Sequence, residues 1–171
     1  ISSTITVAVI DAISDNDFDG VADQTVTASI SDDDVAGFTI AETDGSTTVA
    51  ESGTTDTFTV VLDAQPASDV VLTVTSSDTG EATVNTPLTF TPLNWDTPQT
   101  VTVTGIDDNI IDGTVSSTIT INVIDAISDD NFDPVSSQTV TATTTDNDTA
   151  GFTIVESGGS TSVSESGTTD T

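Results

Sequence analysis

The feature that most constrains the fold is an internal repeat with an offset of 114 residues. Residues 5–57 align with residues 119–171 without a gap, and 36 of the 53 aligned pairs are identical. Self-similarity at a fixed offset is typical of repeat architectures. Because the length of 171 residues is one and a half times the offset, we expect an interior window of a longer array. The expected parts are the C-terminal part of one repeat over residues 1–36, a complete repeat over 37–150 and the first strands of the next over 151–171.

Within the complete repeat, short segments of alternating polarity predict strands rather than helices. Apolar residues make up 34% of the chain, and they are mostly Val, Ile, Leu and Phe with Thr between them, a composition typical of strands. Clusters of Asp, Gly, Ser and Pro separate the segments. The expected strands cover residues 37–40, 47–51, 57–62, 70–75, 87–91, 99–104, 117–124 and 138–145. About seven short strands in such a repeat predict an all-β fold, a tandem antiparallel β-sandwich of immunoglobulin-like type.

The alternation also predicts which side chains face the core of the sandwich. One apolar set falls on the same face of each expected strand. Its members are Phe58, Val60, Leu62, Leu72, Val74, Leu88, Phe90, Val101, Val103, Ile119, Ile121, Val123, Val140 and Ala142.

The charge balance excludes several classes of function. The chain has 29 Asp and Glu residues and no Lys, Arg or His, so its formal charge is −29. No side-chain salt bridge can form, and binding to nucleic acid or to an anionic membrane is excluded as a primary function. The absence of Cys and His removes disulfides, thiolate or imidazole metal sites and Ser-His-Asp triads. No apolar run approaches the ~18 residues of a membrane span, and no signal peptide is recognisable.

The acidic residues are concentrated at predicted strand ends, whereas exposed strand positions carry mostly Thr and Ser. They form three groups: the triplet Asp32, Asp33 and Asp34 with its counterpart Asp146, Asn147 and Asp148; Asp107, Asp108 and Asp112; and Asp15, Asp17, Asp19 and Asp23. Two carboxylates ~4 Å apart repel by about 1 kcal/mol even in water, so such grouping favours a bound cation. Since only oxygen ligands are on offer, a hard cation is expected, and flexible carboxylate-rich loops suit Ca²⁺ better than Mg²⁺.

The third group has partial EF-hand spacing, with Asp at loop positions 1, 3, 5 and 9 and Gly20 at position 6. Val26 stands where a bidentate Glu would close such a loop. In the second copy Pro134 replaces the glycine and the last Asp is lost. The spacing therefore predicts calcium binding for the first copy more than for the second. The alternative for all the acidic loops is a salt-adapted, solubilising surface, although such a surface would scatter its acids over exposed strand faces.

The residues of the central repeat resemble a known family. VAESGTTDTFTVVL, TSSDTGEATV, LTFTP, TVTVTGIDDNIIDG and TVTATTTDNDTAGF follow one another in the order seen in the Calx-beta repeat. The resemblance covers the whole central unit and, through the repeat, both flanks. It implies a calcium-binding β-sandwich of the kind found in sodium-calcium exchangers and, in tandem, in large bacterial surface proteins.

The resemblance implies a set of calcium ligands at one end of the sandwich. They are a first-strand Glu, an Asp after the third strand, the loop containing two adjacent Asp residues, and the acidic triplet that leads into the next domain. In this chain they are Glu51, Asp78, Asp107, Asp108, Asp112, Asp146 and Asp148, with Asn147 as a neutral member of the triplet, Asp32 and Asp34 for the preceding repeat and Glu165 for the following one. The chain departs from the family at Ile110 and Ile111, where further acids usually follow the Asp pair.

These observations lead to a functional hypothesis. We expect an extracellular, cell-surface protein, by resemblance bacterial, in which several Ca²⁺ ions per repeat stiffen the junctions of an adhesin stalk or biofilm matrix fibre. The expected partners are neighbouring repeats of the same chain and like chains in a fibre, without nucleic acid and without direct membrane insertion.

Two other classes of function compete with the structural one. One is an adhesive module that itself binds a glycan or a surface, for which Trp95 is the stacking candidate. The other is a glycosidase that uses Asp107 and Asp108; because these acids are adjacent on one loop without aromatic subsites, we expect no enzymatic activity and assign no catalytic residue.

Overall fold

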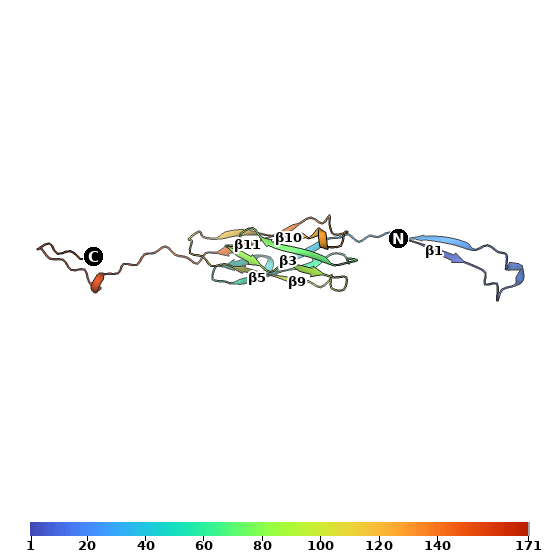
Figure 1. Ribbon diagram of the computed structural model, residues 1–171, viewed down its shortest axis with the longest axis horizontal. Coiled ribbons are helices and arrows are strands. Elements are labelled where there is room, and N and C mark those ends of the chain that lie inside the picture. The colour runs from blue at the N-terminus through green and yellow to red at the C-terminus, as the bar shows by residue number, and fades with distance from the viewer. Residues whose placement is uncertain (171) are drawn as a thin grey trace. The chain divides into compact units, whose positions relative to one another are not determined.

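The computed structural model describes residues 1–170 and divides the chain into two units, residues 1–35 and residues 36–171 (Figure 1). Strands dominate both units. Among the described residues there is no α-helix; the helical elements are four 3-10 turns: η1 (Asn16–Phe18), η2 (Thr43–Gly45), η3 (Asp125–Ile127) and η4 (Ser157–Gly159). Within residues 1–170, no helix has the length and apolar character that a membrane span requires.

The first unit is a single hairpin. Strand β1 (Ser2–Val7) pairs antiparallel with β2 (Gln24–Ser29) in a register that places Ile5 opposite Val26. The long connection between the strands holds η1, where the carboxylate of Asp15 accepts a hydrogen bond from the Asp17 amide at 3.0 Å.

The second unit is a sandwich of two sheets, as the sequence predicts. The four-stranded sheet has the order β3-β5-β9-β7, with β3 (Phe38–Glu42), β5 (Thr55–Leu62), β9 (Gln99–Gly105) and β7 (Ala82–Val84). The five-stranded sheet has the order β4-β11-β10-β6-β8, with β4 (Thr47–Ala50), β11 (Gln138–Thr145), β10 (Val115–Val123), β6 (Val70–Ser76) and β8 (Leu88–Phe90). All pairs are antiparallel except β4 with β11, which is parallel.

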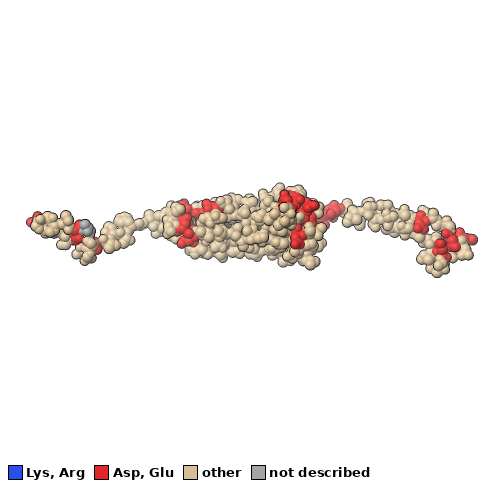
Figure 2. Space-filling model, in the orientation of Figure 1, with Lys and Arg blue, Asp and Glu red and all other residues tan. Residues whose placement is uncertain are grey.

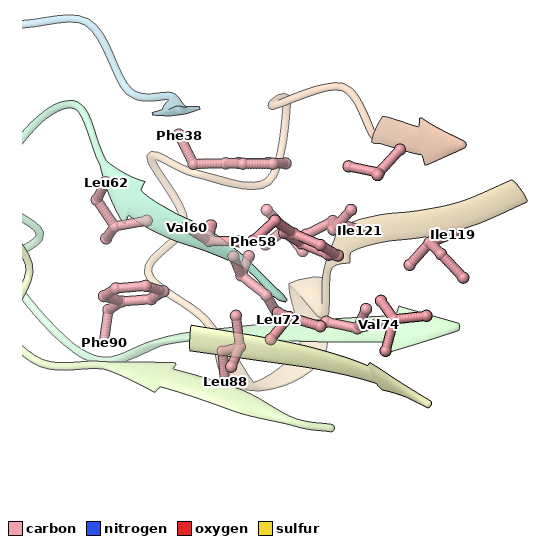
Figure 3. Packing of buried hydrophobic residues seen from close by; sticks show 14 of the residues in the cluster. Phe38, Phe58, Val60, Leu62, Leu72, Val74, Leu88, Phe90, Ile119 and Ile121 are labelled. Carbon is pink, nitrogen blue, oxygen red and sulfur yellow. The ribbon is translucent and has the colours of Figure 1, made fainter. Parts of the chain in front are cut away.

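The core lies between the two sheets (Figure 3). Phe58 and Val60 of β5 face Leu72 of β6 and Ile121 of β10, and each of these side chains is buried. Every core residue expected from the alternation is buried. The core also contains five members that the alternation does not identify: Phe38, Val49, Val70, Ala82 and Phe132.

The strand bounds differ from the sequence prediction mainly at the ends. Nine strands lie between residues 38 and 145, one more than the eight segments that alternation identifies. The additional strand is β7, whose three residues are too few for alternation to be visible. Glu51 lies just after β4 rather than within a strand. Phe132 belongs to the loop that follows β10, and its side chain is buried in the core. This loop therefore packs onto the sandwich.

Residues 151–170 contain η4 and an isolated bridge between Ser164 and Thr168, but no strand. The expected first strands of the next repeat are therefore not formed here, and the last residue of that expected segment, Thr171, lies outside the described residues. Their counterparts β3 and β4 are held by β5 and β11. At an offset of 114, the residues equivalent to β5 are 169–176 and those equivalent to β11 are 252–259, so most of the first strand and all of the second would carry numbers beyond 171.

We expect Ile119→Ala to lower the free energy of unfolding by about 2–5 kcal/mol, because a fully buried side chain would leave a cavity between the sheets. Thr118→Ala is the matched control: Thr118 is exposed on the neighbouring position of the same strand, and its effect should stay within about 0.5 kcal/mol. Urea unfolding followed by circular dichroism measures both. Equal destabilisation by the two variants would contradict the assigned strand face.

Candidate metal centre

Acidic side chains gather at the two ends of the sandwich and are sparse along the side in view (Figure 2). One end collects the loops after β4, β9 and β11 and the residues before β7 and β10. The loop after β4 and the loop after β11 extend from the five-stranded sheet, whereas the residues before β7 and the loop after β9 extend from the four-stranded sheet. This end therefore brings acids from both layers together.

Backbone contacts fix the loops at this end. The Glu51 amide donates to the Thr145 carbonyl at 3.1 Å, which ties the end of β4 to the end of β11. The Ile106 amide donates to the Glu81 carbonyl at 2.9 Å, which ties the end of β9 to the start of β7. Gly105 lies so close to the backbone of Ala50 that an added Cβ would clash with its carbonyl oxygen. The absence of a side chain at Gly105 thus lets the two sheets approach where the acids meet.

Carboxylate oxygens converge in two groups that share Glu51. In each group, one oxygen from every member lies within 4.8 Å of the corresponding oxygens of the others. The first group is Glu51, Glu81, Asp108 and Asp112, and the second is Glu51, Asp146 and Asp148. The chain has no basic side chain to compensate these six acids. A cation from solution is the remaining source of countercharge.

Two oxygens in these groups are buried without a hydrogen-bond partner. They are Oε2 of Glu81 and Oδ2 of Asp148. Buried polar atoms in folded proteins nearly always have a partner, and an unpartnered carboxylate oxygen is particularly costly. Each of these oxygens belongs to a residue of a converging group. Their environment therefore matches metal coordination, which would supply the missing interaction.

Burial, together with the mutual repulsion of the acids, raises the pKa values of three of them. For Glu51 the hydrogen bond from the Asn147 amide lowers the pKa, but burial and the charge of Asp146 outweigh it, so the pKa is raised. Burial, followed by the charges of Asp112 and Glu51, raises the pKa of Glu81. Burial and the charge of Asp146 also raise the pKa of Asp148. These three carboxylates bind protons more readily in the folded protein than in free solution.

Asp146 is the exception, because amide groups stabilise its charge. The Asp148 amide donates to Oδ1 at 2.6 Å and the Gly113 amide to Oδ2 at 2.8 Å. These hydrogen bonds lower the pKa of Asp146. The positive φ of Gly113, 77°, suits a glycine and presents this amide to the carboxylate.

Asn147 connects the loops around the carboxylates. Its backbone amide donates to Oε2 of Glu51 at 3.2 Å, and its side-chain amide donates to Oδ1 of Asp107 at 2.9 Å. The neutral member of the triplet therefore positions two acids of other loops. Asp107 itself is exposed and belongs to neither converging group.

The structure brings together part of the predicted ligand set. The residues that converge are Glu51, Asp108, Asp112, Asp146 and Asp148. The residues that stand outside the two groups are Asp15, Asp17, Asp19, Asp23, Asp32, Asp33, Asp34, Asp78, Asp107, Asn147 and Glu165. The four acids of the loop with EF-hand spacing are exposed, as are Asp32, Asp33, Asp34 and Glu165.

The ligand set predicted from the sequence contains Asp78, which lies outside the two groups, and does not contain Glu81, which belongs to the first. The Asp78 carboxylate accepts a hydrogen bond from the Gly80 amide at 3.0 Å and shapes the turn before β7. Glu81, three residues later, is the acid that enters the group. The signal that identifies it is its position directly before the three-residue strand β7, next to the end of β9 in the sheet.

The opposite end of the sandwich holds a different kind of acidic loop. The Asp129 carboxylate accepts hydrogen bonds from the amides of Ala67 at 2.6 Å, Ser68 at 2.9 Å and Asn131 at 3.0 Å. The bond from the Asn131 amide and then that from Ser68 lower the pKa of Asp129. Asp129 is thus a buried anion already satisfied by amides, and it anchors the loop after β10.

Comparisons with known proteins give matches among solved structures. No protein-family model matches the chain, and no curated protein matches it. Domains 1–6 of the surface layer protein SbsC align over 85% of this chain and 16% of that one, with a TM-score of 0.50 and 22% identity. SbsC domains 4 and 5 give a TM-score of 0.48 at 22% identity over 84% and 57% of the two chains. The apo-form Calx CBD1 domain gives a TM-score of 0.47 at 16% identity over 67% of this chain and 100% of that one.

At these identities the similarity concerns the fold alone. Solved domains of surface-layer and Calx proteins are thus among the structural neighbours of a chain that is itself a β-sandwich.

The raised pKa values predict how the metal-free protein responds to pH. Between their ordinary values, 4.5 for Glu81 and 3.8 for Asp148, and their raised values in the folded state, the folded chain binds more protons than the unfolded chain. The free energy of unfolding therefore falls as pH rises through this range. In a chelator we expect the protein to be more stable at about pH 5 than at about pH 7.

Glu81→Gln should reduce this pH dependence, because it removes one of the carboxylates with a raised pKa. Asp96→Asn, on the exposed loop before β9, is the control and should leave the dependence unchanged. Thermal unfolding in chelator over the pH series measures it. Stability that rises with pH in chelator would contradict the described electrostatics.

Proposed function

We propose that this chain is part of a calcium-binding structural array, with Ca²⁺ held at one end of each sandwich. The observation that carries the proposal is the convergence of six carboxylates, two with buried unpartnered oxygens, in a chain without a basic side chain. The proposed ligands are Glu51, Glu81, Asp108, Asp112, Asp146 and Asp148. Glu51, common to both groups, would lie between adjacent ions.

The chemistry of the donors favours Ca²⁺ over other cations. All the converging atoms are carboxylate oxygens, which are hard ligands suited to Ca²⁺, Mg²⁺ or Mn²⁺ rather than to softer metals. Ca²⁺ accepts 6 to 8 oxygens in flexible geometry, whereas Mg²⁺ requires near-octahedral coordination and retains several waters. Four carboxylates of one group come from three separate segments and supply more oxygens than Mg²⁺ normally takes from protein.

Calcium at this end would stiffen the array. The proposed ligands come from both sheets and from the triplet at residues 146–148, which directly precedes the start of the next repeat. A flexible linker of about 5 residues allows neighbouring domains to swing. If the triplet and Glu51 coordinated the same ion, the segment that leaves β11 toward the next repeat would be held against the sandwich. Asp32, Asp33 and Asp34 would do the same for the preceding repeat, and Glu165 would take the part of Glu51 in the following one.

This proposal places the chain outside the cell, in the stalk of an adhesin or in a matrix fibre on a bacterial surface. Its partners would be neighbouring repeats and like chains in the fibre, and it would have no catalytic role. The alternative, an adhesive module that binds a glycan, depends on an available aromatic face. Trp95 is partly buried against the hydrophobic core, which favours a structural role for its ring.

We expect calorimetric titration to detect Ca²⁺ binding to the chain, and we expect Glu81→Gln to raise the dissociation constant about ten-fold. Removal of one ligand charge weakens the attraction while the side chain keeps its size. Asp96→Asn removes the same charge from an exposed loop outside the groups and should leave the constant unchanged. Identical dissociation constants for the wild type and Glu81→Gln would contradict the assignment of this site.

Calcium should also reverse the pH response described for the chelated protein. With excess Ca²⁺, protons compete with the ion for the carboxylates, so acidification should destabilise the fold. Thermal unfolding in calcium and in chelator across the same pH series gives the two slopes. Slopes of the same sign in both solutions would contradict calcium binding by the groups with raised pKa values.

The stiffening proposal is tested on a chain of three tandem copies of residues 37–150. Small-angle X-ray scattering should give a longer maximum dimension in Ca²⁺ than in chelator. In the double variant Asp146→Asn/Asp148→Asn the difference should disappear, because the triplet then cannot join the coordination. Equal dimensions for the unsubstituted chain in both solutions would overturn the stiffening role without bearing on calcium affinity.

A further inference from the structure

The hairpin of the first unit has the same strand pairing as the closing hairpin of the sandwich, with each paired position shifted by 114 residues. Addition of 114 to the paired positions Ser2 and Ser29 gives Ser116 and Thr143, which are paired in β10 and β11. The same holds for Ile5 with Val26, whose counterparts are Ile119 and Val140. Because a shift of one residue would turn every side chain to the other face, the two hairpins present the same face with the same side-chain order.

That face is covered in one copy and open in the other. Ile119, Val140 and Phe132 are 0%, 4% and 2% exposed in the sandwich. Their counterparts Ile5, Val26 and Phe18 are 54%, 61% and 57% exposed in the hairpin. A row of large apolar side chains on one face of a two-stranded sheet is normally covered by protein.

The sandwich shows what covers this face. Strand β10 pairs along its edge with β6, and β11 pairs with β4. Phe58 of β5 and Val101 of β9 supply core residues from the opposite sheet. All of these elements lie within residues 36–114. Both the hydrogen-bonding edges and the apolar face of the hairpin therefore match one segment.

We propose that the apolar face of the β1–β2 hairpin is a docking surface for a second copy of the segment 37–114. The hairpin would then be the closing hairpin of a preceding sandwich. This inference rests on the repeat organisation of the proposed function and not on calcium. A whole second sandwich is a poor occupant, because its own β10 and β11 already fill the place that the hairpin would take.

The repeat numbering defines the chain that tests the proposal. Ile1 corresponds to Val115, so a copy of residues 37–114 placed directly before Ile1 continues the repeat without a gap. The full 171-residue chain follows unchanged. In this extended chain the docked hairpin would complete a second sandwich.

The burial of the apolar hairpin face can be measured by the reactivity of single introduced cysteines, because the chain has no native Cys. Val26→Cys reports the apolar face of β2, and Thr27→Cys reports the opposite face of the same strand. In the 171-residue chain with Ca²⁺, both thiols should react rapidly with a water-soluble disulfide reagent. In the extended chain, Val26→Cys should react more than about 100-fold more slowly, while Thr27→Cys should be unchanged.

Val140→Cys in the 171-residue chain gives the reference for a thiol in the completed sandwich, since Val140 is buried. A Val26→Cys thiol that stays as reactive in the extended chain as in the 171-residue chain would overturn the proposal. Protection of Val26→Cys in the 171-residue chain that grows with protein concentration would also overturn it, because a second hairpin would then be the occupant. Thiol reactivity is measured at a constant calcium concentration. A negative result would therefore contradict the docking proposal without bearing on the calcium affinity.

Discussion

The burial of mutually repelling carboxylates at one end of the sandwich is the constraint on which the candidate metal centre depends. Glu51, Glu81 and Asp148 are held in or beside buried positions, with raised pKa values and two oxygens that lack partners. Nothing in the chain can neutralise them, because it contains no Lys, Arg or His. A folded state that concentrates like charges without countercharge is costly. The proposed cation would supply this missing countercharge.

The backbone at this end is built to maintain the arrangement. Gly105 permits close approach to Ala50, so the two sheets converge where their acids meet. Asn147 donates one hydrogen bond to Glu51 and another to Asp107. Gly113 and Asp148 donate to Asp146 and keep that acid ionised. These contacts orient the acids without an ion, so binding of the proposed ion would have to impose less ordering.

Much of the fold could be predicted from the sequence, because side-chain alternation reports which face of a strand is buried. Phe58 and Val60 in β5, or Ile119 and Ile121 in β10, are identified in this way and are buried. Strand β7 could not be found, since three residues do not show a period. The burial of Phe132 depends on the packing of a loop, and such packing leaves no periodic signal.

The candidate site was predictable to the extent that its acids are adjacent in sequence or follow a strand end. Asp108 and Asp148 belong to such acidic runs, and both join a converging group. Glu81 could not be placed, because its proximity to Glu51 requires the order of both sheets. The contrast between Asp15 and Asp129 shows the same limit. They are equivalent in the repeat, yet Asp129 is buried by the amides of a loop some sixty residues earlier, and Asp15 is exposed.

The most direct test of the calcium centre is a crystal structure grown with Ca²⁺, examined for anomalous scattering. The account predicts anomalous peaks with carboxylate oxygens of Glu51, Glu81 and Asp148 about 2.3–2.6 Å away. Unpartnered oxygens of Glu81 and Asp148 would then be calcium ligands. A well-ordered end of the sandwich with no peak at these residues, or with calcium only on exposed acids such as Asp15 to Asp23, would contradict it.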